Sequence, residues 1–216
     1  MLVARAPSNV RFLVSKPMQP ILILASSSVY RQQLLRRLRF DFRAMAPDID
    51  ESPNDDETPA QTALRLAESK AAAVARHAPG ALIIGSDQLA ALDGQALGKP
   101  GSHANALLQL QQLRGRRVVF HTALCLYDNR ARAPAGRLQL AQVDSFVTFR
   151  HLPDHELDAY LRLEQPYDCA GSAKNEGLGI ALIEKIESTD PTALTGLPLI
   201  ALTGMLRQSG LMFFQN

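Results

Sequence analysis

The sequence predicts an α/β fold built on a mixed sheet, and two observations indicate it. Helical and strand-like segments alternate along the 216 residues, which is the arrangement found in α/β proteins. Their connections include long crossovers, which join parallel strands, and short hairpin-like turns, which join antiparallel strands. A chain of this length, with 46% hydrophobic and 20% charged residues, suits one domain of two lobes better than two independent domains. We therefore expect residues 18–216 to form a single two-lobed domain.

Residues 1–17 are expected to be a disordered N-terminal extension of that domain. They carry scattered basic residues, and their apolar residues are too interrupted for the hydrophobic region of a signal peptide. Met18 is an alternative start of translation. No run in the sequence approaches the length of a membrane span, so we expect no membrane association.

Charge and cysteine content narrow the class of protein further. A formal net charge of +2 does not indicate binding to a nucleic-acid polymer. Cys125 and Cys169 are the only cysteines, and there is neither a CxxC motif nor a histidine cluster, so no disulfide framework and no zinc site are predicted. We expect reduced cysteines and a cytoplasmic location.

The first strand and the first helix meet at a hydroxyl-rich turn. Apolar residues 21–25 predict a buried strand, and the leucines within residues 34–38 lie at helical spacing. Three serines fill positions 26–28, and Arg31 follows one turn into the helix. At such a junction, unpaired N–H groups, hydroxyls and a guanidinium can donate to phosphate oxygens. The alternative is that Ser28 simply caps an amphipathic helix and that Arg31 lies in solvent.

The rest of the chain continues the alternation. Residues 46–53 form a polar, proline-bounded loop, and Thr58-Pro59 begins a helix with one apolar face. Residues 81–85 predict a buried strand that stops at the polar residues 86–88. The later predicted elements are a helix at 102–113, strands at 118–127 and 138–149 that pair across 128–136, a short helix from Pro153, a glycine-punctuated loop at 171–179, a strand at 180–184 and a closing helix at 198–206.

Asp87 is the strongest candidate for chemistry. A lone carboxylate directly after an apolar strand either caps a helix or is displayed in a cleft. Residues 89–92 continue as an apolar extended run, which disfavours the cap. In the 46–53 loop, Asp50 and Glu51 form an acidic pair that suits a hard divalent cation, although exposed loop acids without any ligand are also common.

Two lysines could bind phosphate. Lys70 lies close to the apolar face of the second helix, where it could either snorkel to solvent or reach over the sheet edge toward a phosphate. Lys99 stands between Gly98 and Pro100, where the proline restricts the backbone and the glycine permits close approach of a ligand. There is no Walker A spacing around it.

These groups together predict metal-assisted cleavage of a phosphoanhydride. In such a reaction a divalent cation, Mg²⁺ or Mn²⁺, neutralises the phosphates while a carboxylate activates water. The sequence offers no competing Ser-His-Asp or Cys-His arrangement, because its five histidines lie in helical, strand or turn contexts with ordinary explanations.

The motifs just described resemble those of the Maf family of nucleoside triphosphate pyrophosphatases. The resemblance covers about residues 21–208, and the motifs occur in family-like order and spacing. They are Leu24-Ala25-Ser26-Ser27-Ser28 with Arg31, Asp50-Glu51, Glu68-Ser69-Lys70-Ala71, Ser86-Asp87-Gln88 and Gly98-Lys99-Pro100. The resemblance implies an elongated mixed sheet flanked by helices, a two-lobed Maf/ITPase-like fold with its site in a central cleft, and cleavage between the α- and β-phosphates. A homodimer is also a family expectation.

The resemblance also implies residue roles. Asp87 matches the family's general base, and Glu51 and Asp87 would share the divalent metal. The matching positions for phosphate binding are Ser26, Arg31, Lys70 and Lys99.

Within the family, the chain looks like the branch that hydrolyses 7-methyl-GTP. Gln88 and the segment 169–177 (CAGSAKNEG) carry this likeness, and Tyr30, Gln88 and Glu176 would select the base. Tyr30 stands where that branch commonly has a tryptophan. A base methylated at N7 is positively charged, which favours an aromatic face and a carboxylate.

Two alternatives remain beside 7-methyl-GTP hydrolysis. One keeps the reaction but replaces the substrate with dTTP or UTP, and a panel of nucleotides separates the two. The other is a nucleotide-binding regulator of cell division without significant turnover, which binding without hydrolysis would favour.

Overall fold

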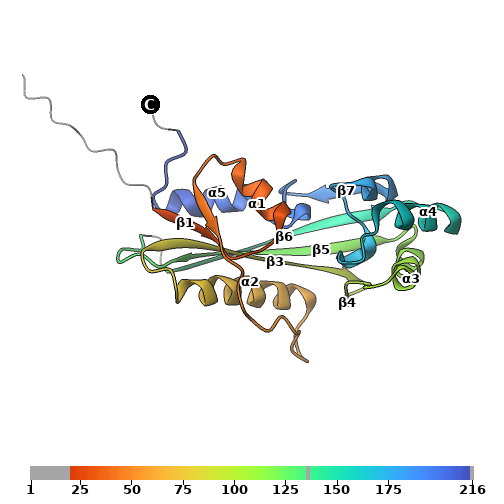
Figure 1. Ribbon diagram of the computed structural model, residues 1–216, viewed down its shortest axis with the longest axis horizontal. Helices are drawn as coiled ribbons and strands as arrows, with labels where there is room; N and C mark the ends of the chain where they lie inside the picture. Colours follow the sequence, from red (N-terminus) through yellow and green to blue (C-terminus); the bar gives the residue numbers. More distant parts are fainter. Residues whose placement is uncertain (1–19, 135–136, 215–216) are drawn as a thin grey trace, which may run out of the picture.

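A computed structural model describes residues 20–134 and 137–214, and its centre is one long twisted sheet with helices on both faces (Figure 1). The elements in chain order are β1 (Ile21–Leu24), α1 (Val29–Arg36), β2 (Phe42–Ala44), α2 (Pro59–Ala75), β3 (Ala81–Leu92), β4 (Gln95–Leu97), α3 (His103–Leu113), β5 (Arg117–Asp128), β6 (Leu138–Phe149), α4 (Asp154–Glu164), the 3-10 helices η1 (Ala170–Ser172) and η2 (Leu178–Leu182), β7 (Ile183–Ser188), the 3-10 helix η3 (Ala193–Thr195) and α5 (Leu199–Gln208). The extension predicted at residues 1–17 lies outside the described residues. Within the described residues, no helix is long and apolar enough to cross a bilayer.

The sheet is mixed, as predicted. Its strands follow the order β2-β1-β3-β5-β6-β7, and β4 pairs with part of β3. β1 runs parallel to β2 and to β3, because α1 and α2 provide crossovers. The neighbours β3 and β5, β5 and β6, and β6 and β7 pair antiparallel. Of these pairs only β5 and β6 follow one another directly in the chain, since α3 precedes β5 and α4 precedes β7. Alternating helices and strands therefore led to the correct class of sheet.

The largest difference from the predicted elements concerns β3. The sequence predicts that this strand stops at residues 86–88, but it continues without interruption to Leu92. What ends near Ile84 is the parallel pairing with β1, and antiparallel pairing with β4 begins at Ala90. Among the described residues, the part of β3 between Ile84 and Ala90 pairs only with β5, which lies along the opposite edge of the strand. This stretch, which includes Asp87 and Gln88, thus has an open edge in the middle of the sheet.

Other local corrections are smaller. The short strands β2 and β4 are missing from the prediction. The sequence does contain a signal for β4, because Asp93-Gly94 is a typical hairpin turn, and both residues adopt positive φ angles of 50° and 79°. The strand predicted at 180–184 begins three residues later, at Ile183, because η2 occupies the residues before it.

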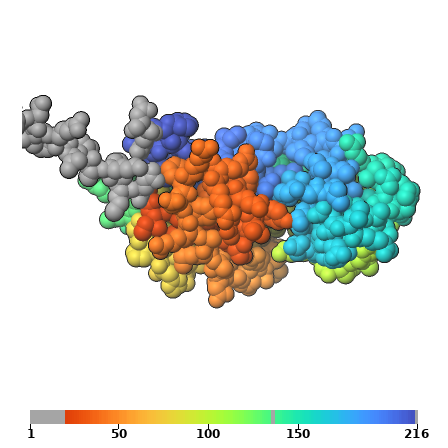
Figure 2. All heavy atoms as spheres, turned by 45° about the horizontal axis from the view of Figure 1, so that its top comes forward, coloured from red at the N-terminus to blue at the C-terminus, as the bar shows by residue number. Residues whose placement is uncertain are grey.

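The core consists of three clusters that divide the molecule around the open edge of β3. Near β1, one face of the sheet packs on α2 and the opposite face on α1 and α5. At the far end, β5, β6 and β7 pack on α3 and α4. Figure 2 shows the first part of the chain gathered on one half of the molecule and α4 with its following loop on the other. The two-lobed arrangement with a central cleft is therefore confirmed.

Candidate functional site

A cavity of about 770 Å³ lies between the two halves at the open edge of β3. It is lined by all nine residues to which the family resemblance assigns a role, whereas Asp50 of the acidic pair does not line it. The nine are Ser26, Tyr30, Arg31, Glu51, Lys70, Asp87, Gln88, Lys99 and Glu176. These residues come from loops, helices and strands separated by up to 150 positions in the chain. The fold therefore brings the predicted set together, while the role of each residue stays a prediction.

Lys70 binds the two carboxylates at one side of the cavity. Its Nζ lies 2.6 Å from Asp87 Oδ1 and 2.8 Å from Glu51 Oε1. The Lys70 and Asp87 side chains are only 7% and 9% exposed, whereas the Glu51 side chain is 56% exposed. Lys70 therefore does not simply snorkel to solvent, and its predicted binding of phosphate stays a prediction. The ammonium lies buried between two acids.

The close packing of α2 on β3 explains how Lys70 comes to lie beside Asp87. Gly85 lies two residues before Asp87 on the same face of the strand, and a Cβ built on it would lie 2.1 Å from the Ala67 carbonyl oxygen of α2. The missing side chain lets the helix approach the strand. Lys70, about one helical turn after Ala67, then lies beside Asp87.

The environments of the two carboxylates differ. Burial raises the pKa of Asp87 above its usual range, against the opposing effect of Lys70 and Arg31. Partial burial by itself would raise the pKa of Glu51. The net effect is a lowered pKa, because Glu51 accepts a hydrogen bond from Lys70 and lies near the charges of Lys70, Lys99 and Arg31. A raised carboxylate pKa is typical of a proton acceptor tuned toward neutral pH.

The serine-rich turn caps α1 and supports Arg31, while its binding of phosphate stays a prediction. Ser28 caps α1, because its side chain accepts a hydrogen bond from the Arg31 N–H. Ser26 is buried, and its Oγ accepts from the Ser28 N–H at 3.1 Å and from Arg31 Nη1 at 3.4 Å. Arg31 does not lie free in solvent, since its Nε also donates to the Gly196 carbonyl at 2.8 Å. The guanidinium is thus held against the wall of the cavity.

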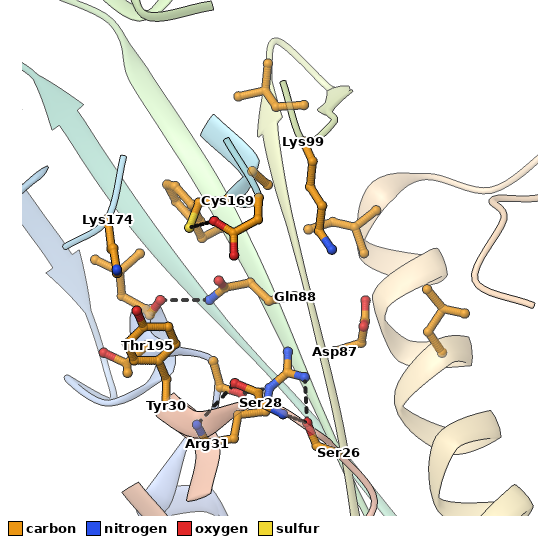
Figure 3. A pocket seen from close by; sticks show the side chains of 18 of the residues that line it. Ser26, Ser28, Tyr30, Arg31, Asp87, Gln88, Lys99, Cys169, Lys174 and Thr195 are labelled. Atoms are coloured by element: carbon orange, nitrogen blue, oxygen red, sulfur yellow. Dashed lines mark hydrogen bonds between the residues drawn. The ribbon is translucent and has the colours of Figure 1, made fainter. Parts of the chain in front are cut away.

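The alternation of β3 separates two sets of groups. Successive side chains of a strand point to opposite faces, so Asp87 points toward α2 while Gln88 points toward Tyr30, Thr195 and Lys174 (Figure 3). Lys99 is exposed on the loop after β4, and its charge acts on Glu51. Asp87 and its partner Lys70 therefore lie on the α2 side of β3, and Gln88 lies on the other side.

The opposite side of the cavity contains residues that the sequence analysis did not single out. Lys174 Nζ lies 5.5 Å from the centroid of the Tyr30 ring and 3.3 Å from Glu164 Oε1. Asp168 and Thr195 also line the cavity. A signal for Lys174 existed, since it stands two positions before Glu176 in the 169–177 motif. No local pattern marks Thr195, which reaches the site only through the fold.

A divalent cation is compatible with this donor set, but not as a cage made by the protein alone. The described part of the chain contains no group of three or more His, Cys, Asp or Glu side chains placed to hold a metal ion. Glu51 and Asp87 nevertheless offer two hard oxygen ligands joined through one ammonium. Mg²⁺ is commonly bound by one or two carboxylates together with substrate phosphates and water, and that is the arrangement these residues fit.

Comparison with known proteins finds similarity over most of the chain. The model of the family described as "Maf-like protein" matches residues 21–209. The chain is 61% identical to the "7-methyl-GTP pyrophosphatase" of Cupriavidus metallidurans, over 91% of this chain and 97% of that protein. It is 63% identical to the protein of the same name from Ralstonia nicotianae, over 88% of this chain and 96% of that one. A solved dITP/XTP pyrophosphatase from Mycobacterium abscessus aligns over 61% of this chain and 75% of that chain, with 20% identity and a TM-score of 0.39, which is too low to support a conclusion.

Proposed function

Because this chain belongs to the Maf family, we propose that it is a nucleotide pyrophosphatase that hydrolyses 7-methyl-GTP to 7-methyl-GMP and pyrophosphate. The observation that carries the proposal is the contact of Lys70 with both Asp87 and Glu51 in a cavity lined by further cations. The substrate is proposed from the names of relatives that are 61% and 63% identical to it over the aligned residues.

Asp87 is the proposed general base. Its carboxylate takes a proton from a water molecule whose oxygen forms a bond to the α-phosphorus, and the bond from that phosphorus to the bridging oxygen breaks, so that pyrophosphate leaves. The raised pKa of Asp87, caused by burial, improves it as a proton acceptor. Lys70 holds the carboxylate in position through a 2.6 Å contact.

The phosphates are bound by the groups that surround this pair. Arg31 and Lys99 approach from the α1 turn and the loop after β4, and Ser26 contributes a hydroxyl beside Arg31. Glu51 and Asp87 would hold Mg²⁺ or Mn²⁺ together with phosphate oxygens. When bound, the cation would neutralise phosphate charge and stabilise the charge that develops on the leaving group.

The base is proposed to lie on the Gln88 side of β3. Tyr30 offers an aromatic face, and Glu176 and Asp168 supply negative charge at the cavity wall. A 7-methylguanine carries a positive charge that GTP lacks, so these groups favour it through cation–π and charge-assisted contacts worth about 0.5–2 kcal/mol each.

Pyrophosphate release tests the proposal. The wild type and Asp87→Asn are assayed with Mg²⁺ or Mn²⁺ on 7-methyl-GTP, GTP, dTTP, UTP and CTP. We expect preference for 7-methyl-GTP and a loss of at least about 100-fold in kcat for Asp87→Asn. Asp55→Asn, an exposed loop acid outside the cavity, is the matched control.

Three outcomes would contradict the proposal in different ways. Preference for dTTP or UTP would keep the reaction and change the substrate. Binding without hydrolysis would favour the regulator. Turnover by Asp87→Asn equal to that of Asp55→Asn would remove Asp87 as the base.

We also propose that the enzyme acts in the cytoplasm, where nucleoside triphosphates are available, and that it forms a homodimer. Light scattering of the purified full chain tests the second point, and the mass of a single chain would contradict it.

A further inference from the structure

The amide group of Gln88 has a fixed orientation. Its Nε2 lies 2.8 Å from Thr122 Oγ1, 2.9 Å from the Ala193 carbonyl and 3.0 Å from the Leu194 carbonyl. Backbone carbonyls only accept hydrogen bonds, so the end of the amide that faces them must be the NH₂ group. If the amide were turned around, its oxygen would face two carbonyl oxygens, neither of which can donate a hydrogen bond. Within the described residues no side chain or backbone group donates to Gln88 Oε1.

Thr122 completes this arrangement. It is fully buried and lies directly opposite Gln88 in the β3–β5 register. Its hydroxyl donates to the Ala193 carbonyl at 3.0 Å. Because the hydroxyl hydrogen of Thr122 is used in this bond, its oxygen can only accept a hydrogen bond from the Gln88 amide. A chain of hydrogen bonds running from Gln88 through Thr122 to Ala193 fixes which end of the amide faces η3.

We infer that Thr122 is a positioning residue that holds Gln88 as a hydrogen-bond acceptor toward the nucleobase, an inference that rests on the proposed function. With its NH₂ group used by the protein, Gln88 presents only Oε1 to a ligand. Asp168 and Glu176 add further acceptors to the cavity wall. These three acceptors suit hydrogen-bond donors on the base, and the donors Lys174 and Thr195 line the same side of the cavity.

Hydrogen-bond acceptors such as Gln88 Oε1 can distinguish the standard bases by the donors that each base carries along its edge. Guanine presents two adjacent donors, the ring N1–H and the 2-amino group. Thymine and uracil present one ring N–H between two carbonyl oxygens, and adenine and cytosine place an acceptor nitrogen beside their amino group. Methylation at N7 leaves the N1–H and the 2-amino group in place. The 2-amino group is thus the feature that Gln88 and its neighbours are placed to recognise, independently of the positive charge of the ring.

The experiment compares 7-methyl-GTP with 7-methyl-ITP, which lacks only the 2-amino group. We expect kcat/KM of the wild type to favour 7-methyl-GTP by at least about tenfold, because a site built for a donor rejects the analogue that lacks it. Thr122→Val keeps the shape of the side chain but removes its hydroxyl. It should lower this ratio several-fold through a higher KM for 7-methyl-GTP, with kcat reduced much less, and Thr122→Ser, which restores the hydroxyl, should restore the ratio.

Equal efficiency of the wild type on the two nucleotides would overturn the inference and leave the proposed function intact. An unchanged ratio in Thr122→Val would remove Thr122 as a positioning residue. If the wild type hydrolyses neither nucleotide, the proposed function fails, and calorimetric binding of 7-methyl-GMP against 7-methyl-IMP still decides the inference. The wild-type ratio needs no variant, so it decides the base preference even if Thr122→Val does not fold.

Discussion

Lys70 Nζ lies 2.6 Å from Asp87 Oδ1, and the two side chains are only 7% and 9% exposed. A buried ion pair of this kind contributes little net stability by itself, but removing one partner leaves an uncompensated charge. The pair thus links the stability of the α2–β3 packing to the ionisation of the proposed base.

Lys70→Met should therefore destabilise the protein and reduce its activity. We expect a loss of about 3 kcal/mol in the free energy of unfolding, because the Asp87 carboxylate stays buried without its ammonium. The double variant Lys70→Met/Asp87→Asn should recover part of that loss, since no unpaired charge remains. Urea unfolding measures both. Equal losses in the single and double variants would contradict a buried ionic pair.

Gly85→Ala should be destabilising, since the new methyl group would clash with the Ala67 carbonyl oxygen at 2.1 Å. We expect a loss of about 1–3 kcal/mol from overpacking, accompanied by displacement of Lys70 and lower activity. Gly204→Ala in α5 is the matched control, because nothing lies within 4 Å of its Cβ and alanine favours a helix by up to about 1 kcal/mol. Thermal unfolding should shift in opposite directions for the two variants. A shift in the same direction would refute the close-packing argument.

Gly196→Ala tests the support of Arg31. Gly196 adopts a φ of 97°, and a Cβ on it would lie 3.2 Å from Arg31 Nε. Gly210 has a similar φ of 88° with nothing within 4 Å, so Gly210→Ala reproduces the backbone strain without the contact. Both variants should lose about 1 kcal/mol of stability or more, but only Gly196→Ala should raise KM for 7-methyl-GTP. A matching rise in KM for Gly210→Ala would mean that the contact with Arg31 is unimportant.

Glu57 should contribute to acid sensitivity. A hydrogen bond from Arg65 is the main cause that lowers the pKa of Glu57 from 4.5 to about 2. Since the folded state holds this carboxylate ionised, its contribution to stability is fully present above about pH 4.5 and is lost as the pH falls toward 2. Glu57→Gln does not titrate, so its urea midpoint should fall less between pH 6 and pH 3 than that of the wild type. Parallel pH dependence would exclude Glu57 as a source of acid sensitivity.

Glu176→Gln should reduce discrimination between 7-methyl-GTP and GTP, because it removes a negative charge beside a cationic base. We expect kcat/KM to fall about tenfold with 7-methyl-GTP and less with GTP. Glu184, which is exposed on β7 and does not line the cavity, provides the control variant Glu184→Gln. Equal losses on both nucleotides would argue against recognition of the charge by Glu176.

The sequence by itself was sufficient for the elements whose signals are local. Ser28 before α1 and the Thr58-Pro59 start of α2 mark their helices through capping hydrogen bonds that span only three residues. The alternation of helices and strands led to the mixed sheet, and the family resemblance carried by short motifs pointed to nine of the residues that line the cavity. Each of these signals depends on neighbouring residues, which is why it can be read from the chain.

Only the tertiary structure decided what depends on distant partners. β3 continues past residues 86–88 because β5 pairs along nearly its whole length, while the early end of β1 opens the edge beside Asp87. Lys70 meets Asp87 across 17 positions, and the Gln88 amide is oriented by carbonyls 105 and 106 positions away. Hydrogen bonds between residues so far apart in the sequence depend on how strands and helices pack against one another. No local sequence pattern can therefore predict them.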